Sequence, residues 1–325
     1  MNYSDYYKEE VLGKWFEEKQ RILGDAYNPN TLKILALQEE FIDFIAFFLE
    51  QGQKNGFEDN RNSLLFMAAM FGKLNMVKWL VNVGADINSI TEFGDNGGTP
   101  IFAAIANENK EDFEVVSWLK ENGAKIINIK NIYGYTLISS AALSEKIEMI
   151  KFLVKLGADI NEKNENNTTP LYMAALAGKT ESIKCLVSLG AKIDEKVNNM
   201  APIFIAASKG QVESIKCLVS LGVNVNVTDD NGMTPVFMAA SGGHVDCIEC
   251  LKSLGADINI KTNEGFTPFF MAVAACKIES MKCLKSLGAD INVKHNGGKT
   301  PLTFAKEVNE LAEAAKWLEA NGAQE

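Results

Sequence analysis

Histidine is scarce in this sequence. Only His244 and His295 occur among 325 residues, and they lie in different segments. The sequence also lacks the G-x-S-x-G, G-x-x-x-x-G-K-[ST] and H-E-x-x-H motifs, and no G-x-G-x-x-G stands between a strand and a helix. We therefore expect no catalytic residues, no cofactor and no enzyme activity. An enzyme remains a minor alternative.

One local cluster has the composition of a metal site. His244, Cys247 and Cys250 are spaced so that three soft ligands would lie along one helix. A structural zinc site takes four ligands, however, and no second Cys or His pair lies nearby in the sequence. We expect no metal here.

Long apolar runs and a secretory leader are absent as well. No stretch of 18 apolar residues occurs, and the N-terminus MNYSDYYKEE has no apolar core. We expect a cytoplasmic protein without membrane contact, acting in a host cell if it is an exported effector, with its six cysteines as free thiols. The net charge of -10 argues against nucleic acid and favours a protein partner.

The sequence repeats itself with a period near 33 residues. The glycine of a recurring G-A-D/K or G-V-N triplet marks each copy, and the decapeptide ESIKCLVSLG occurs twice, at 181–190 and 213–222. Such a period indicates a stacked array of one small unit. The marker glycines are Gly84, Gly123, Gly157, Gly190, Gly222, Gly255, Gly288 and Gly322.

Each copy predicts two short antiparallel helices and an extended turn. In one copy, Pro235 suits the first helical position and Thr234 can cap the free amides. Residues 244–253 have the apolar spacing of a one-faced helix, and Gly255 can close it in the left-handed conformation. A helix pair this short cannot bury its apolar faces alone, so the copies must stack into a solenoid.

The copies resemble the ankyrin repeat family. The T-P-L-H-x-A-A pattern of that family appears as Thr169-Pro170-Leu171-Tyr172-Met173-Ala174-Ala175, and its L-L-x-x-G-A-D-x-N pattern appears at 186–194. Eight copies cover about 61–325. The resemblance implies an all-α solenoid of paired antiparallel helices with β-hairpin-like fingers, which binds a partner protein or peptide on its concave surface.

We divide the chain into an N-terminal capping helix (1–27), a degenerate repeat (28–60), seven repeats (61–298) and a C-terminal capping repeat (299–325). Residues 1–27 place apolar side chains on one side of a helix, which suits a cap. The alternative is an adaptor, in which this helix joins a captured protein to an enzyme complex. We expect a monomer.

Within each copy, some positions are expected to pack in the core and others to contact a partner. At the position five residues before the marker glycine, which we call the cysteine column, some copies have an aromatic residue and others have Cys185, Cys217, Cys250 or Cys283. A methionine recurs in the first helix, as Met67, Met173, Met238 and Met271. We expect both sets of side chains to be core. The resemblance places the contact surface on the fingers and the outer ends of the first helices, where apolar side chains favour protein binding. The predicted partner-binding residues are Met70, Phe71, Phe93, Ile132, Tyr133, Tyr135, Leu143, Leu176, Met200, Met233 and Phe266.

Overall fold

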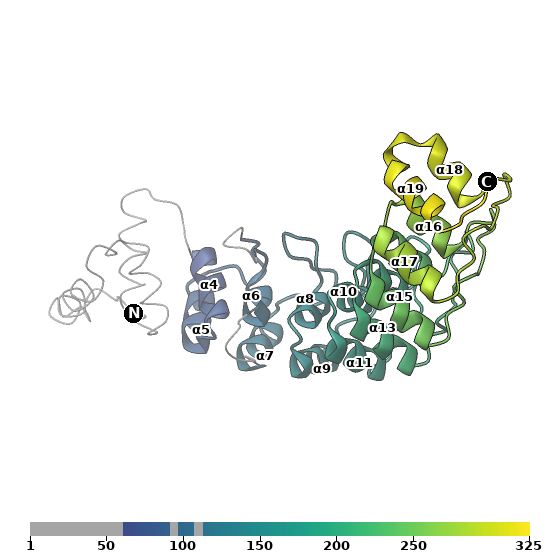
Figure 1. Ribbon diagram of the computed structural model, residues 1–325. Coiled ribbons are helices and arrows are strands. Elements are labelled where there is room, and N and C mark those ends of the chain that lie inside the picture. Colours follow the sequence, from purple (N-terminus) through teal and green to yellow (C-terminus); the bar gives the residue numbers. More distant parts are fainter. Residues whose placement is uncertain (1–60, 92–96, 107–112) are drawn as a thin grey trace, which may run out of the picture. The chain divides into compact units, whose positions relative to one another are not determined.

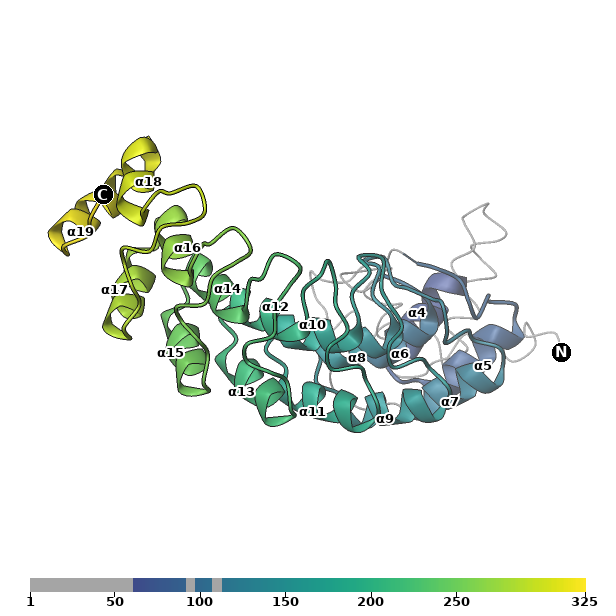
Figure 2. The same ribbon diagram turned by 90° about the vertical axis from the view of Figure 1, so that its right-hand side faces the viewer.

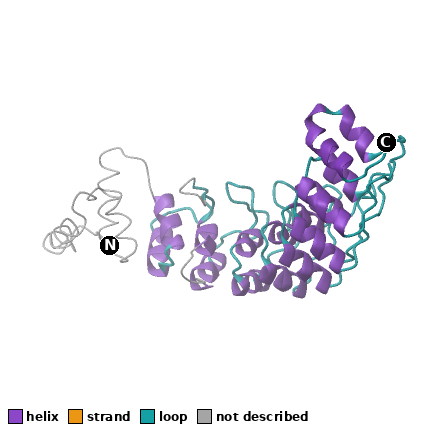
Figure 3. Cartoon of the chain, in the orientation of Figure 1, coloured by secondary structure: helices purple, strands orange, loops and turns teal. Residues whose placement is uncertain are grey.

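The computed structural model describes residues 61–91, 97–106 and 113–325. Sixteen α-helices and one short 3-10 helix lie in these described ranges, which contain no strand (Figures 1 and 3). None of the described helices is long and apolar enough to cross a membrane. The predicted capping helix, 1–27, and the degenerate repeat, 28–60, lie outside the described residues.

The chain forms two compact units. Among the described residues, unit 1 contains 61–91, 97–106, 113–141 and 155–158, and unit 2 contains 142–154 and 159–325. The boundary falls within the third repeat, formed by α8 (Leu137–Leu143) and α9 (Ile147–Lys155).

Unit 1 contains the first two repeats. They consist of α4 (Arg61–Met70), α5 (Leu74–Asn82), α6 (Pro100–Ala106) and α7 (Phe113–Glu121). Helix α4 packs on α5 of its own repeat and on α6 of the next, while α5 packs on α7.

Unit 2 continues the pattern through five more helix pairs. First helices pack on first helices, from α10 to α18, and second helices pack on second helices, from α11 to α17. Figure 2 shows these as two rows, with the connecting loops extending beside the first-helix row. The helices are α10 (Pro170–Leu176), α11 (Thr180–Ser188), α12 (Pro202–Ser208), α13 (Val212–Ser220), α14 (Pro235–Gly242), α15 (Val245–Ser253), α16 (Pro268–Ala274), α17 (Ile278–Ser286), α18 (Pro301–Glu307), η4 (Asn309–Leu311) and α19 (Ala312–Ala320).

The first helices begin at the Thr-Pro pairs, but the hydroxyls of Thr99 and Thr234 are buried without a hydrogen bond and cap nothing. The hydroxyls of Thr169, Thr267 and Thr300 each accept a hydrogen bond from the backbone N–H three residues later. The cap predicted at Thr234 is wrong, because its buried hydroxyl makes no hydrogen bond. Pro235 still occupies the first helical turn, where the missing N–H costs nothing.

The marker glycines end the second helices in the left-handed region, as predicted. Gly255 has φ +94°, and its N–H donates to the carbonyl of Lys252 at 3.0 Å. Left-handed backbone is costly for residues with a Cβ atom, which explains why glycine recurs at this position.

Aromatic and sulfur side chains fill the space between repeats. Phe66, Phe204, Phe237 and Phe270 are at most 1% exposed in their first helices. The predicted cysteine column is confirmed as core: its four members are 6–8% exposed, and burial raises the pKa of each thiol. Protonated, buried thiols pack as small apolar groups.

Candidate interaction surface

The loops that link successive repeats, which we call fingers, are positioned by a column of asparagines. In unit 1, Asn88 Nδ2 donates to the carbonyl of Gly123 at 3.1 Å, and Asn88 Oδ1 accepts from the N–H of Lys125 at 2.9 Å. In unit 2, Asn259 makes the same two bonds, to Gly288 at 3.3 Å and Asp290 at 3.0 Å. Each of these asparagines therefore holds its finger against the next one.

Unit 1 adds a second connection near the fingertips. The first finger is closed by an antiparallel bridge between Thr91 and Gly98. The second finger, which we call finger 2 (residues 124–136), donates from Ile132 N–H to the carbonyl of Gly97 at 3.1 Å. Within finger 2, Asn131 Oδ1 accepts from the N–H groups of Tyr133 and Tyr135 at 3.1 and 2.9 Å. These bonds attach the described part of the first finger to finger 2 and order the turn of finger 2.

The fingers of unit 1 expose large apolar side chains. Ile90 is 69% exposed, Ile127 and Tyr133 are 48% exposed, and Ile132 is 44% exposed. Elsewhere in the described ranges, the single large apolar side chain with comparable exposure is Leu221, at 36%. Exposed apolar groups that gather on one surface are typical of binding sites.

The structure distinguishes among the predicted contact residues. Ile132 and Tyr133 are exposed, and the Tyr133 and Tyr135 rings lie near each other, with centroids 6.3 Å apart. Phe93 lies outside the described residues. Whether Ile132, Tyr133 and Phe93 contact a partner stays a prediction. The remaining predicted residues are half-buried: Met70, Phe71, Tyr135, Leu143, Leu176, Met200, Met233 and Phe266.

Phe266 packs against its own surroundings in unit 2. Its ring stacks on His295 with centroids 4.8 Å apart, and it meets the Phe270 ring edge-on at 5.0 Å. This packing provides a structural role for Phe266.

The prediction that the recurring methionines are core holds in part. Met67 and Met173 are buried, but Met238 on α14 and Met271 on α16 are only half-buried.

Ile90 and Ile127 are absent from the predicted set. Both stand where most other copies have a polar residue. Ile127 lies four residues after its marker glycine, the place of Asn88, Asn161, Asn226, Asn259 and Asn292. Ile90 lies six residues after its own, where Lys163, Lys196, Lys261 and Lys294 occur. A comparison of the copies at each position would have found them.

The charges of finger 2 differ from those of the unit 2 fingers. Residues 124–136 contain Lys125 and Lys130 but no carboxylate, and neither ammonium group forms an ion pair within the described residues. In unit 2, Lys163 pairs with Glu195 at 2.8 Å, and Lys196 lies 3.9 Å from Asp230. Finger 2 is therefore a cationic segment of an acidic chain.

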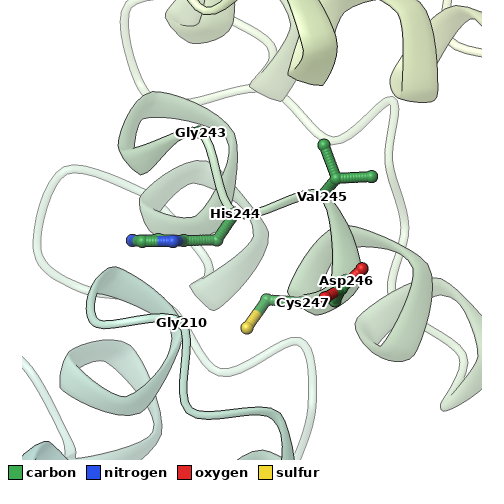
Figure 4. A pocket seen from close by; sticks show the side chains of 6 residues that line it. All are labelled: Gly210, Gly243, His244, Val245, Asp246 and Cys247. Carbon is green, nitrogen blue, oxygen red and sulfur yellow. The ribbon is translucent and has the colours of Figure 1, made fainter.

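The His244 cluster lies beside a hollow of about 280 Å³ in unit 2 (Figure 4). His244 Nε2 lies 2.9 Å from the carbonyl of Ser208, so this nitrogen carries the proton. Cys247 is fully buried, and burial raises the pKa of its thiol to about 12. A thiol held protonated is a poor metal ligand. No group of three or more potential metal ligands was found in the described part of the chain.

Comparison with known proteins agrees with this architecture. A family model described as ankyrin repeats (3 copies) matches residues 65–164, 140–229 and 203–295. A fowlpox virus (strain NVSL) protein named as an ankyrin repeat protein, FPV031, is 30% identical over 138 residues, covering 41% of this chain and 38% of that protein. Alpha-latroinsectotoxin-Lt1a of Latrodectus tredecimguttatus is 31% identical over 100 residues, covering 31% of this chain and 7% of the toxin.

Solved structures show the same fold. The human ASB11 ankyrin repeat domain matches with a TM-score of 0.56 and 25% identity, covering 67% of this chain and 97% of that domain. By contrast, this chain spans 38% and 7% of the length of the two curated relatives, well under half of each.

Proposed function

Because this chain belongs to the ankyrin repeat family, whose members are generally protein-interaction modules, we propose that it binds a partner protein or an extended peptide and performs no catalysis. The fingers of unit 1 form the primary contact surface. The observation that carries this proposal is the gathering of Ile90, Ile127, Ile132 and Tyr133 as exposed apolar side chains on two joined fingers.

The physical argument concerns the free energy of hydration. Burying apolar surface stabilises a complex by about 25 cal/mol per Å². Aromatic side chains such as Tyr133 are frequent among the residues that dominate binding energy. The hydrogen bonds that hold finger 2 reduce the ordering cost of association, because this part of the surface is in place before the partner arrives.

A double substitution tests this assignment. Tyr133→Ala/Tyr135→Ala is expected to weaken partner binding by about tenfold or more, because two aromatic anchors are lost. The melting temperature should change little, since Tyr133 is exposed and Tyr135 is half-buried. The full chain and the variant are immobilised in parallel, and proteins captured from native cell extract are compared by mass spectrometry.

The matched control is Leu221→Ala, which removes the exposed apolar side chain of unit 2. Proteins lost with the tyrosine variant and retained by this control support the proposal. Melting of the tyrosine variant many degrees below the wild type would make both tyrosines packing residues and contradict it.

A further inference from the structure

We propose that finger 2 recognises an acidic segment of the partner, in which a large apolar side chain is flanked by Asp or Glu. This inference rests on the proposed function and adds the chemistry of the partner. It follows from three features of finger 2: its charge, the identity of residue 127 and its rigid attachment.

The charge of finger 2 is opposite to that of the chain. The chain has a net charge of -10, whereas residues 124–136 carry two lysines and no acidic residue. Lys125 is exposed and Lys130 is half-buried, and no carboxylate of the described residues pairs with either. At physiological ionic strength charges are screened beyond about 8 Å, so a bound segment responds mainly to the charges within that distance.

Ile127 provides an apolar anchor between the two lysines in the sequence. Five other copies have an asparagine at this place, whereas the Ile127 side chain has no hydrogen-bonding group. The side chain is instead 48% exposed to water. An apolar side chain that is exposed where most copies have a polar residue is typical of a binding surface.

The backbone of finger 2 is held at both ends. Lys125 N–H donates to Asn88 Oδ1 at 2.9 Å, and Ile132 N–H donates to the carbonyl of Gly97 at 3.1 Å. Lys125 stands at the first of these attachments, and Ile127 and Lys130 lie between the two. The lysine and apolar groups are therefore presented from a fixed loop, which allows side-chain chemistry to select the partner.

The fingers of unit 2 lack this combination. The finger at 223–234 carries Asp229 and Asp230 and no lysine, and the finger at 191–201 has two lysines balanced by Asp194 and Glu195. None of the unit 2 fingers has a large apolar side chain with the exposure of Ile127. An acidic segment should therefore bind at finger 2 and avoid these loops.

The test selects peptides from a random displayed library on the immobilised full chain. Selected peptides are expected to contain Asp or Glu next to Leu, Ile, Phe or Trp. Their synthetic forms should bind Lys125→Glu/Lys130→Glu about tenfold more weakly than wild type, and binding to wild type should fall as salt rises from about 50 to about 300 mM. The variant Ile127→Asn, which introduces the residue of the other copies, should fold normally and also bind about tenfold more weakly.

The matched control is Lys261→Glu/Lys294→Glu, which reverses two exposed lysines on unit 2 fingers and should leave affinity unchanged. The selected peptides could instead be neutral or basic, bind the Lys125→Glu/Lys130→Glu and Ile127→Asn variants as well as wild type, and lose affinity only for Tyr133→Ala/Tyr135→Ala. That result would overturn this inference and keep the proposed function. Failure to select any peptide that discriminates wild type from the tyrosine variant would contradict both. Binding of phosphatidylserine vesicles in place of peptides would also overturn it.

Discussion

The fingers of the two units have similar backbones but differ in what their side chains contact. In unit 2 the finger polar groups bond to one another: Asn263 Nδ2 donates to the carbonyl of Asp230 at 2.9 Å, and Asn296 Nδ2 donates to the carbonyl of Asn263 at 3.0 Å. In unit 1, finger 2 has Ile127 in the asparagine column and leaves two lysines without ion pairs. These asparagines of unit 2 therefore bond to the neighbouring finger, while finger 2 exposes an apolar side chain and two lysines that a partner can cover.

This difference shows how a repeat array separates stability from recognition. The packing columns that stack the repeats are filled in both units, with Phe66 in unit 1 and Phe237 in unit 2 both fully buried. Finger residues contribute little to that core, so they can change from copy to copy without loss of the fold. Departures from the repeat are therefore informative where they fall on the surface.

The largest expected effect comes from breaking the core of one unit. Phe237→Ala is expected to lower the free energy of unfolding by about 3–5 kcal/mol, because it leaves a cavity between α12, α14 and α16. Hydrogen exchange followed by mass spectrometry should show faster exchange of amides in unit 2 and little change in unit 1.

Phe66→Ala is the counterpart in unit 1, since Phe66 is equally buried in α4. It should accelerate exchange in unit 1 and spare most of unit 2. Equal acceleration across both units by either substitution would contradict their division into two compact units.

A smaller effect is expected from the asparagine column. Asn259→Ala removes two hydrogen bonds between neighbouring unit 2 fingers and should lower the free energy of unfolding by about 1–2 kcal/mol, measured by urea denaturation. Asn231→Ala is the control, because the Asn231 side chain is exposed and makes no hydrogen bond among the described residues. Equal losses for both variants would show that the column does not hold the fingers together.

The sequence predicted the helices, the glycine caps and the cysteine column, because these follow from local chemistry repeated in register. It failed at Thr234, since the orientation of a hydroxyl depends on neighbours that the motif does not encode. It also assigned Met238 and Met271 to the core with Met67, although their exposure is set by how the adjacent first helices pack. Ile90 and Ile127 were missed because periodicity emphasises what the copies share, and these residues differ.

The smallest expected effect concerns a turn that one copy of unit 2 builds differently from the first copy of unit 1. Cys276 adopts φ +52° between α16 and α17, where the corresponding turn of unit 1 has Gly72 at φ +68°. A residue with a Cβ atom is strained in this region, so Cys276→Gly should raise the free energy of unfolding by about 0.5–1 kcal/mol in urea denaturation. Cys276→Ala removes the thiol but keeps the Cβ atom, and should change stability by less than about 0.5 kcal/mol. If Cys276→Ala raised the free energy of unfolding as much as Cys276→Gly, the gain would come from removing the thiol. The left-handed backbone at residue 276 would then carry no strain.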